Sequence, residues 1–185
     1  MTIEQAAYQV RFDWGLAGLE AIGADADVAV WVDAIATAPP PDHPPAASAS
    51  AVIDVDVRTA AAAARWLLAL QERLARRITI AVVAAGEPRP DGSTRCAVED
   101  QLAAGAVVSH LGALGIDATS PEAATAEAAY RQLERAVGHL VSAGVTGRAV
   151  SVRPAPFRVD EELGAEAVVV RRPHPEDGPP TVSRG

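Results

Sequence analysis

Apolar and polar positions along the chain follow two periods, which together predict an α/β protein. Continuous apolar runs or strict alternation, both typical of strands, occur at residues 8–12, 27–32, 51–57, 78–83, 149–152 and 167–170. Apolar residues at helical spacing occur between them, at residues 16–22, 59–76, 96–111 and 120–143. Strands that alternate with helices predict a mixed β-sheet packed between helices, in one compact α/β domain at residues 1–172.

Two segments fall outside this pattern. Residues 38–50 are rich in proline, which suits neither a helix nor a central strand, so an exposed linker is expected within the domain. Residues 173–185 contain further prolines and few apolar side chains, and a disordered tail is expected there.

Local signals add detail to two of the helices. The sequence Ser-Pro-Glu at residues 120–122 is a strong helix start, because a serine oxygen caps the free N–H groups of a first turn. In the segment 96–111, helical spacing places Val98, Leu102 and Ala106 on one face, which is expected to face the core. Gly105 in the same segment allows close packing against a neighbouring element.

The amino-acid composition argues against several classes of partner and reaction. The 185 residues carry a net charge of −8, with a sequence pI of about 4.9. Nucleic acids and anionic membranes need clustered cations, so neither is expected as a partner. All sixteen basic residues are arginines, which excludes a lysine base or a lysine Schiff base. Cys96 is the single cysteine, which excludes an internal disulfide.

Targeting signals are not apparent in the sequence. The first residues lack the basic and apolar regions of a signal peptide. No apolar run approaches the length of a membrane span. A cytoplasmic protein is therefore expected.

Candidate chemistry concentrates in residues 77–111, where an apolar strand runs into a polar loop and then a helix. Ligands of α/β proteins gather outside the carboxyl ends of strands, so this loop is a candidate site. In the first helical turn, Glu99 and Asp100 are adjacent and either belong to a site or only stabilise the helix start through its dipole. Because adjacent residues point about 100° apart, both reach one small ligand only with help from the loop.

Three aspartates elsewhere are further candidates. Asp33 directly follows the buried segment 27–32, which is a favoured catalytic or metal position; the alternative is an aspartate that caps the next turn. Asp54 and Asp56 share one face of the alternating segment 51–57. Two acids on one face could hold a divalent cation, but more often they form the solvated side of a sheet.

Several blocks of the sequence occur in the order found in one known family. The longest is AAGEPRPDGSTRCAVEDQLAAGAVV at residues 84–108. The shorter blocks are VRFDWGLAGLEAIG (10–23), VAVWVDA (28–34), VRTAAAAARWL (57–67), SPEAATAEAAYR (120–131) and TGRAV (146–150). On these blocks, which touch most of the chain, the sequence resembles the 2-phosphosulfolactate phosphatase family in its actinobacterial form.

The resemblance implies Mg²⁺-dependent removal of phosphate from a small sulfonated or carboxylated acid. It implies catalytic roles for Asp33, Glu87 and Asp100, and Mg²⁺ ligands at Asp33, Glu87 and Glu99. It implies that the substrate is bound by Arg58, Ser93, Arg95 and Arg148. These residue types suit the chemistry, because carboxylates hold Mg²⁺ and guanidinium groups bind phosphate or sulfonate oxygens bidentately.

One βαβ portion is missing relative to the family. After its first aspartate the family carries a Ser/Thr-rich segment, a helix, a strand and a Ser-Pro-Asn-Gly-Ser loop, whereas here the proline-rich segment follows Asp33 closely. The gap is expected to open one flank of the sheet, and an uncovered edge invites pairing, so a homodimer is expected. Two alternatives stay open: a family member that catalyses another reaction on a small anionic metabolite, and a non-catalytic binding or assembly protein.

Overall fold

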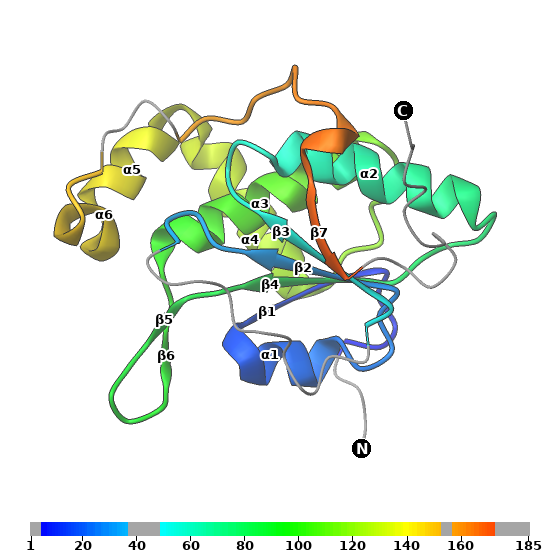
Figure 1. The fold of residues 1–185 in the computed structure, drawn as a ribbon, viewed down its shortest axis with the longest axis horizontal. Helices are drawn as coiled ribbons and strands as arrows, with labels where there is room; N and C mark the ends of the chain where they lie inside the picture. Colours follow the sequence, from blue (N-terminus) through cyan, green and yellow to red (C-terminus); the bar gives the residue numbers. More distant parts are fainter. Residues whose placement is uncertain (1–4, 37–48, 153–156, 173–185) are drawn as a thin grey trace, which may run out of the picture.

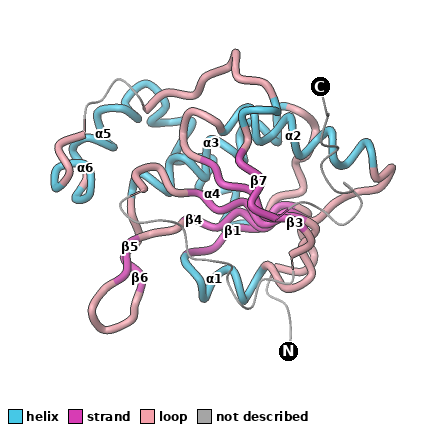
Figure 2. Tube along the Cα trace, in the orientation of Figure 1, coloured by secondary structure: helices cyan, strands magenta, loops and turns pink. Residues whose placement is uncertain are grey.

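The fold is a five-stranded mixed β-sheet with helices on both faces, as the sequence predicts. The computed structural model describes residues 5–36, 49–152 and 157–172. The strand order is β1-β4-β2-β3-β7, in which β7 is antiparallel and the other strands are parallel. The strands are β1 Val10–Trp14, β2 Val28–Val32, β3 Ala51–Val55, β4 Ile80–Ala84 and β7 Val169–Arg172. Figures 1 and 2 show the sheet running through the middle of the molecule.

Helices cover the two faces of the sheet unequally (Figure 1). α1 (Gly15–Ile22) lies on one face, and α2 (Ala60–Arg73) and α3 (Val98–Ala113) lie on the other. α4 (Pro121–Leu133) packs along α3 and contacts β1. The later helical elements are η1 (Glu134–Ala136), α5 (Val137–Ala143), α6 (Val145–Ala149) and η2 (Ala165–Ala167). Within the described ranges, none of these helices combines the length and apolar composition that a membrane crossing requires.

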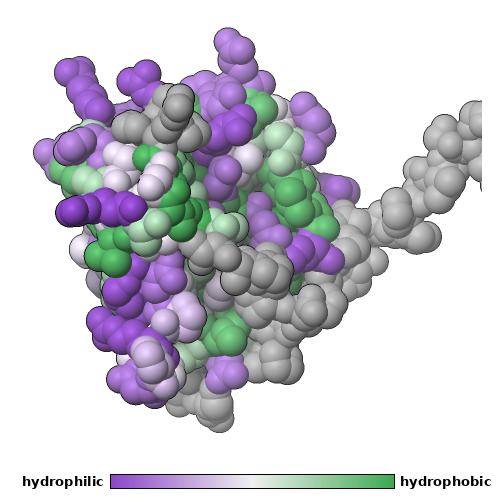
Figure 3. Space-filling view, turned by 60° about the vertical axis from the view of Figure 1, so that its left-hand side comes forward, coloured by the Kyte–Doolittle hydropathy of each residue, from purple (hydrophilic) through white to green (hydrophobic). Residues whose placement is uncertain are grey.

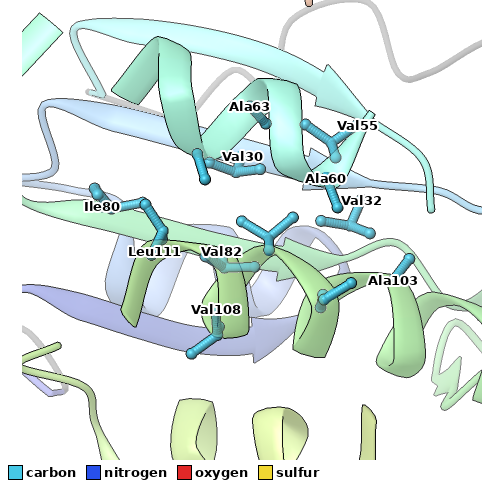
Figure 4. Close-up of a cluster of buried hydrophobic side chains, with 14 of the residues drawn as sticks. Val30, Val32, Val55, Ala60, Ala63, Ile80, Val82, Ala103, Val108 and Leu111 are labelled. Carbon is cyan, nitrogen blue, oxygen red and sulfur yellow. The ribbon is translucent and has the colours of Figure 1, made fainter. Parts of the chain in front are cut away.

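The main core forms where α2 and α3 meet the parallel strands. Figure 4 shows strand residues Val30, Val32, Val55, Ile80 and Val82 facing helix residues Ala60, Ala63, Ala103, Val108 and Leu111. β2 and β4 lie inside the sheet and are buried at every position, which explains their continuously apolar sequences. On the opposite face, Leu19 and Ile22 of α1 belong to a smaller cluster with Trp31 of β2.

Two local predictions are wrong. Residues 120–143 do not form one helix, because α4 ends at Leu133 and η1 separates it from α5. The break at Glu134–Ala136 directly precedes Val137 and Gly138, which are poor helix formers, and α5 packs against α3. The expected strand at 149–152 is also absent, because helix α6 ends at Ala149 and a turn follows. A segment of four residues is too short to distinguish a strand period from a helical one.

The remaining predicted strands and main helices form within a few residues of their expected bounds. The predicted linker at 38–50, apart from its last two residues, lies outside the described residues. The predicted tail at 173–185 lies outside them as well.

The outer side of β3 is covered by this chain itself. β7 pairs antiparallel with β3, and Nε of Arg171 in β7 lies 2.7 Å from Oδ1 of Asp54 in β3. Among the described strands, β1 and β7 therefore form the two edges of the sheet. Val169 and Val170 of β7 are exposed, so this edge carries apolar side chains on its surface.

Ser120 caps α4 as predicted, and its contact gives a first test of the fold. Its side-chain oxygen accepts a hydrogen bond from the backbone N–H of Ala123 at 3.1 Å, in a buried position. Ser120→Ala is expected to lower the free energy of unfolding by about 1 kcal/mol, because that N–H loses its partner. Urea unfolding measures the change.

The matched control for Ser120 is Thr125→Ala in the same helix. The exposed hydroxyl of Thr125 donates only to the carbonyl of Pro121, so its removal is expected to change stability by about 0.5 kcal/mol or less. Equal losses in the two variants would contradict the capping role of Ser120.

Candidate functional site

The candidate site lies at the carboxyl ends of β4, β2 and β3, which are neighbours in the sheet. Asp33 directly follows β2, and Glu87 opens a short hairpin of β5 (Glu87–Pro88) and β6 (Thr94–Arg95) after β4. The first turn of α3 supplies Glu99 and Asp100. We call Asp33, Glu87, Glu99 and Asp100 the carboxylate cluster. Besides burial, the negative charges of Glu87 and Glu99 raise the pKa of Asp33, and those of Asp33 and Glu99 raise the pKa of Asp100.

Asp100 joins the ends of the two central strands. Its carboxylate accepts hydrogen bonds from the backbone N–H of Ala34 after β2, at 2.9 Å, and of Gly86 after β4, at 2.8 Å. Burial, with the charges of Asp33 and Glu99, raises the pKa of Asp100 from 3.8 to about 7 despite these two hydrogen bonds. Because each oxygen already accepts a backbone N–H, Asp100 holds the backbone of the site in place.

Asp33 offers a free carboxylate oxygen to the site. Its Oδ1 accepts the backbone N–H of Ile35 at 3.1 Å, which is the turn-capping role considered from the sequence. Its Oδ2 makes no hydrogen bond within the described residues. Burial raises the pKa of Asp33, and the negative charges of Glu87, Asp54 and Glu99 raise it further, while the Ile35 hydrogen bond lowers it.

Glu99 is the most deeply buried acid of the cluster. Its side chain is 1% exposed, and neither carboxylate oxygen has a hydrogen-bond partner in the described part of the chain. A Cβ added to Gly144, between α5 and α6, would lie 3.1 Å from Oε2 of Glu99, so this junction packs directly against the carboxylate. A buried carboxylate without a donor is costly, so the protein's own contacts leave Glu99 unexplained.

The predicted core face of α3 is wrong at its first residue. Val98 is 39% exposed, whereas the adjacent Glu99 and Asp100 are buried. The sheet, α2, α4 and α5 all contact α3, so most of its circumference is buried and one apolar stripe does not define its inner face. Both acids therefore point into the protein, and they are not only partners of the helix dipole.

Thr146 is a site residue that the sequence reasoning did not select. Its hydroxyl donates to Oε1 of Glu87 at 3.0 Å and accepts from Nη2 of Arg95 at 2.9 Å. Glu87 and Arg95 also pair across the β5–β6 hairpin. The block TGRAV contains Thr146, but a threonine before a helical glycine carries no signal of its own in one sequence. Thr146 fixes the side chains of Glu87 and Arg95 together.

The hairpin begins at Gly86, which has a φ of +63°. A Cβ there would lie 2.5 Å from Cγ2 of Thr94 and 2.7 Å from the carbonyl oxygen of Arg95, so only glycine lets the hairpin fold back this closely. Figure 1 shows the loop beyond β5 and β6 extending away from the sheet. Ser93 lies in this loop, exposed, and its hydroxyl donates to Asp91 at 2.7 Å. The structure does not bring Ser93 to the carboxylate cluster.

The other predicted substrate-binding residues are Arg58 and Arg148. Arg58 lies in the turn after β3, at the same end of the sheet as Asp33, and Arg148 lies on α6. Both side chains are exposed, and neither guanidinium forms a hydrogen bond or ion pair within the described residues. Figure 3 turns the side with α5 and α6 forward and shows hydrophilic residues interspersed with hydrophobic ones. Arg58 and Arg148 are thus available to an anion.

Asp54 and Asp56, considered as a cation-binding pair, each have a partner in the protein. Asp54 pairs with Arg171. Oδ1 of Asp56 accepts the backbone N–H of Thr59 at 2.9 Å, and the Thr59 hydroxyl accepts the N–H of Asp56 at 3.0 Å. Thr59 directly precedes α2 but forms no capping hydrogen bond there, because its side chain bonds back to Asp56.

The acids suit a hydrated cation better than an enclosed one. In residues 5–36, 49–152 and 157–172, no three His, Cys, Asp or Glu side chains gather closely enough to hold a metal ion. Mg²⁺, however, usually keeps several waters and binds proteins through one or two carboxylates. Asp33 and Glu99 both have carboxylate oxygens without a donor, and the charge of Glu99 acts on Asp33. These residues fit a hydrated Mg²⁺.

The raised pKa of Asp100 predicts a pH-dependent stability. The folded protein holds this proton more tightly than the unfolded chain, so the contribution is present below the unfolded pKa and is lost as pH rises through about 7. Asp100→Asn does not titrate. The free energy of unfolding of the wild type relative to this variant is therefore expected to fall by about 2–4 kcal/mol between about pH 5 and about pH 8.

Urea unfolding with a chelator present measures this difference at both pH values. Asp117→Asn is the control, because Asp117 is an exposed acid in the loop after α3. The same change in charge at this exposed site is expected to change the free energy of unfolding by no more than about 0.5 kcal/mol. A pH-independent difference for Asp100→Asn would contradict the raised pKa.

Comparison with known proteins does not identify the function of this site. No protein-family model matches the chain, and no curated protein matches it either.

Proposed function

We propose that this protein is a Mg²⁺-dependent phosphatase that removes phosphate from a small sulfonated or carboxylated substrate, as the family resemblance implies. The observation that carries the proposal is the carboxylate cluster: the four acids selected from the sequence interact electrostatically at the carboxyl ends of the central strands. Acids whose pKa is raised by burial and by neighbouring charges, as for Asp33 and Asp100, are typical of functional sites. Their uncompensated charge favours a bound cation.

Each residue of the site has a distinct role in this proposal. The charges of Asp33 and Glu99 would hold a hydrated Mg²⁺ through its waters, and the bound ion would polarise the phosphoryl oxygens. Oδ2 of Asp33, which has no hydrogen bond among the described residues, accepts the proton of the attacking water, and its raised pKa makes it a stronger base than an ordinary aspartate. Glu87, fixed by Thr146, orients that water, and Asp100 keeps the ends of β2 and β4 in register.

Arginines bind the anionic substrate in this proposal. The guanidinium groups of Arg58 and Arg148 have no partner within the described residues, so they are free to bind phosphate and sulfonate or carboxylate oxygens. Arg95 is held by Thr146 and stays close to Glu87. The proposal leaves Ser93 out of the site, because its hydroxyl is bonded to Asp91 in an exposed loop.

Phosphate release from a panel of small phosphate esters, with Mg²⁺ and with a chelator, tests the proposal directly. Release that requires both a phosphorylated acid and Mg²⁺ supports it. Thermal shifts against matched phosphates, sulfonates and carboxylates provide a second readout. A shift that is independent of metal, without phosphate release, would overturn the phosphatase and favour another reaction on a small anion. No shift and no release would favour a binding or assembly protein.

The proposal places the protein in the cytoplasm as a homodimer. The edge strand β7, with exposed Val169 and Val170, is the surface on which we expect a second copy to pair. Light scattering at high protein concentration is expected to give twice the chain mass of 19.1 kDa. Val169→Lys, which puts a charge on this edge, is expected to give the monomer mass. A monomeric wild type would contradict the dimer.

A further inference from the structure

The junction between α5 and α6 seals Glu99 from solvent. Both carboxylate oxygens of Glu99 are buried and have no hydrogen-bond partner in the described chain. Oε2 would lie 3.1 Å from a Cβ added to Gly144, so the cover over the carboxylate is a glycine backbone. The charge of Glu99 acts on Asp33, which places the sealed carboxylate in the carboxylate cluster. A cation at the cluster therefore cannot touch Glu99 while this junction stays in place.

The segment that forms this cover is weakly anchored. α6 has five residues and packs mainly on α5, which precedes it. Val145 at its start and Val150 directly after it are 67% and 49% exposed, so α6 buries little apolar surface. Figure 1 shows α5 and α6 at one side of the molecule. Low burial of this kind is typical of segments that open locally.

Thr146 is the side chain that attaches α6 to the site. Its hydroxyl donates to Oε1 of Glu87 at 3.0 Å and accepts from Nη2 of Arg95 at 2.9 Å. Within the described ranges, every other hydrogen bond of residues 144–152 ends within residues 140–152. Both partners of the hydroxyl carry charge, so these hydrogen bonds are stronger than neutral ones. One side chain therefore supplies the polar attachment of α6 to the rest of the site.

Two backbone junctions bound the segment. Gly144 lies between two helices and has an extended backbone, with φ −60° and ψ 167°. Ser151, after α6, has a φ of +55°, a left-handed conformation that is uncommon for a residue with a side chain. Hinge rotations concentrate at the ends of secondary-structure elements. Residues 144–151 thus form a short unit between two junctions, attached to the site by Thr146.

We propose that residues 144–151 form a gate over Glu99, which Thr146 holds shut and which opens to admit a cation to the carboxylate cluster. A buried carboxylate without a donor is unfavourable, and a hydrated cation compensates it once the gate has opened. Because the same hydroxyl fixes Glu87, the gate closes again before Glu87 orients the attacking water. The cation as Mg²⁺, and this role of Glu87, rest on the proposed function; the gate rests on the contacts of residues 144–151.

Carbodiimide coupling of an amine to carboxylates, read by peptide mass spectrometry, measures access to Glu99 in the metal-free protein. Glu99 is expected to be labelled at least about tenfold more slowly than Asp117, an exposed acid after α3. Thr146→Val keeps the shape of threonine without its hydroxyl. It is expected to label Glu99 about tenfold faster, because two charge-assisted hydrogen bonds are lost. Labelling of Glu99 at the wild-type rate in this variant would overturn the gate.

Two control variants locate the effect at the Thr146 hydroxyl. Thr146→Ser keeps the hydroxyl and is expected to label Glu99 at the wild-type rate. Thr125→Val removes an exposed hydroxyl that bonds within α4, and it is also expected to leave this rate unchanged. Equal acceleration in Thr146→Ser and Thr146→Val would overturn the role of the hydroxyl.

Hydrogen exchange of the metal-free wild type separates local opening from unfolding of the whole chain. The backbone N–H groups of Arg148 and Val150 donate within the segment, to the carbonyls of Gly144 and Thr146, at 3.0 Å each. Their protection is expected to be at least about 100-fold lower than that of the most protected amides of α2. Equal protection would show that residues 144–151 open only when the fold is lost, and would overturn the gate.

Mg²⁺ separates the gate from the proposed function. Millimolar Mg²⁺ is expected to slow labelling of Glu99 at least about threefold, whereas KCl at the same ionic strength has no such effect. If Mg²⁺ has no effect while Thr146→Val still accelerates labelling, the Mg²⁺ site and the proposed phosphatase fail and the gate stands. If Mg²⁺ slows labelling but Thr146→Val behaves as the wild type, the gate fails and the proposed function stands.

Discussion

Gly105→Ala is expected to destabilise the protein by more than about 3 kcal/mol, enough to threaten folding of an average domain. A Cβ at this position would lie 2.1 Å from the carbonyl oxygen of Ala126 and 2.8 Å from Cβ of Tyr130, both on α4. The clashing oxygen belongs to a helix backbone, so no side-chain rotation relieves the clash. α3 and α4 would have to separate, and the buried side chains between them would lose contact.

Gly112→Ala on the same helix is the matched control. Apart from adjacent residues and the helix's own backbone, no atom of the described residues lies within 4 Å of a Cβ placed there. Alanine is favoured over glycine in a helix by up to about 1 kcal/mol, so this variant is expected to be as stable as the wild type or more stable. Urea unfolding of both variants measures the contrast. A Gly105→Ala protein as stable as the wild type would contradict the close packing of α3 on α4.

The close packing at Gly105 and most of the layered fold could be predicted from the sequence, because both leave a local signal in it. Burial on two sides leaves β2 and β4 without polar residues, and that pattern can be read from one sequence. The capping oxygen of Ser120 is likewise a local signal, because donor and acceptor are three residues apart. Features set by neighbours in the chain were therefore the predictable part.

Features set by distant contacts were not predictable in this way. Thr146 bonds to Glu87 across 59 positions, and nothing near Thr146 in the sequence indicates this contact. Val98 is exposed and Glu99 is buried because α5 packs on α3 and Gly144, at the end of α5, lies against Glu99. Helical periodicity describes one helix on one surface, and it fails where a helix is enclosed on several sides.

The carboxylate cluster was predictable in part from local sequence signals and depends in part on contacts between distant residues. Its four acids were selected from the sequence, since acidic residues after strands and in a first helical turn stand out locally. Their mutual interaction, and the lack of a donor for Glu99, appear only in the folded chain. Burial and like charge raise the pKa values of Asp33 and Asp100, so in the metal-free protein their ionised forms oppose folding. For Asp33, removal of the charge is therefore expected to lower activity and raise stability.

Asp33→Asn is expected to reduce Mg²⁺-dependent phosphate release by about 10²–10⁴-fold, because the variant loses the proposed base and a charge that attracts the hydrated Mg²⁺. The same change is expected to raise the melting temperature of the metal-free protein at about pH 8. The pKa of Asp33 is raised in the folded state, so its stabilising contribution is lost as pH rises and the ionised form is unfavourable. Asparagine keeps an oxygen for the N–H of Ile35 and carries no charge.

Measuring both phosphate release and melting temperature distinguishes an acid needed for function from one needed for the fold. A residue needed only for the fold would lose activity and melting temperature together when replaced. Asp117→Asn, at an exposed site with the same change in charge, is expected to alter neither quantity. Full activity in Asp33→Asn would remove Asp33 from the proposed mechanism. A fall in its melting temperature would show instead that the aspartate stabilises the turn after β2, which is the alternative reading of its position at the strand end.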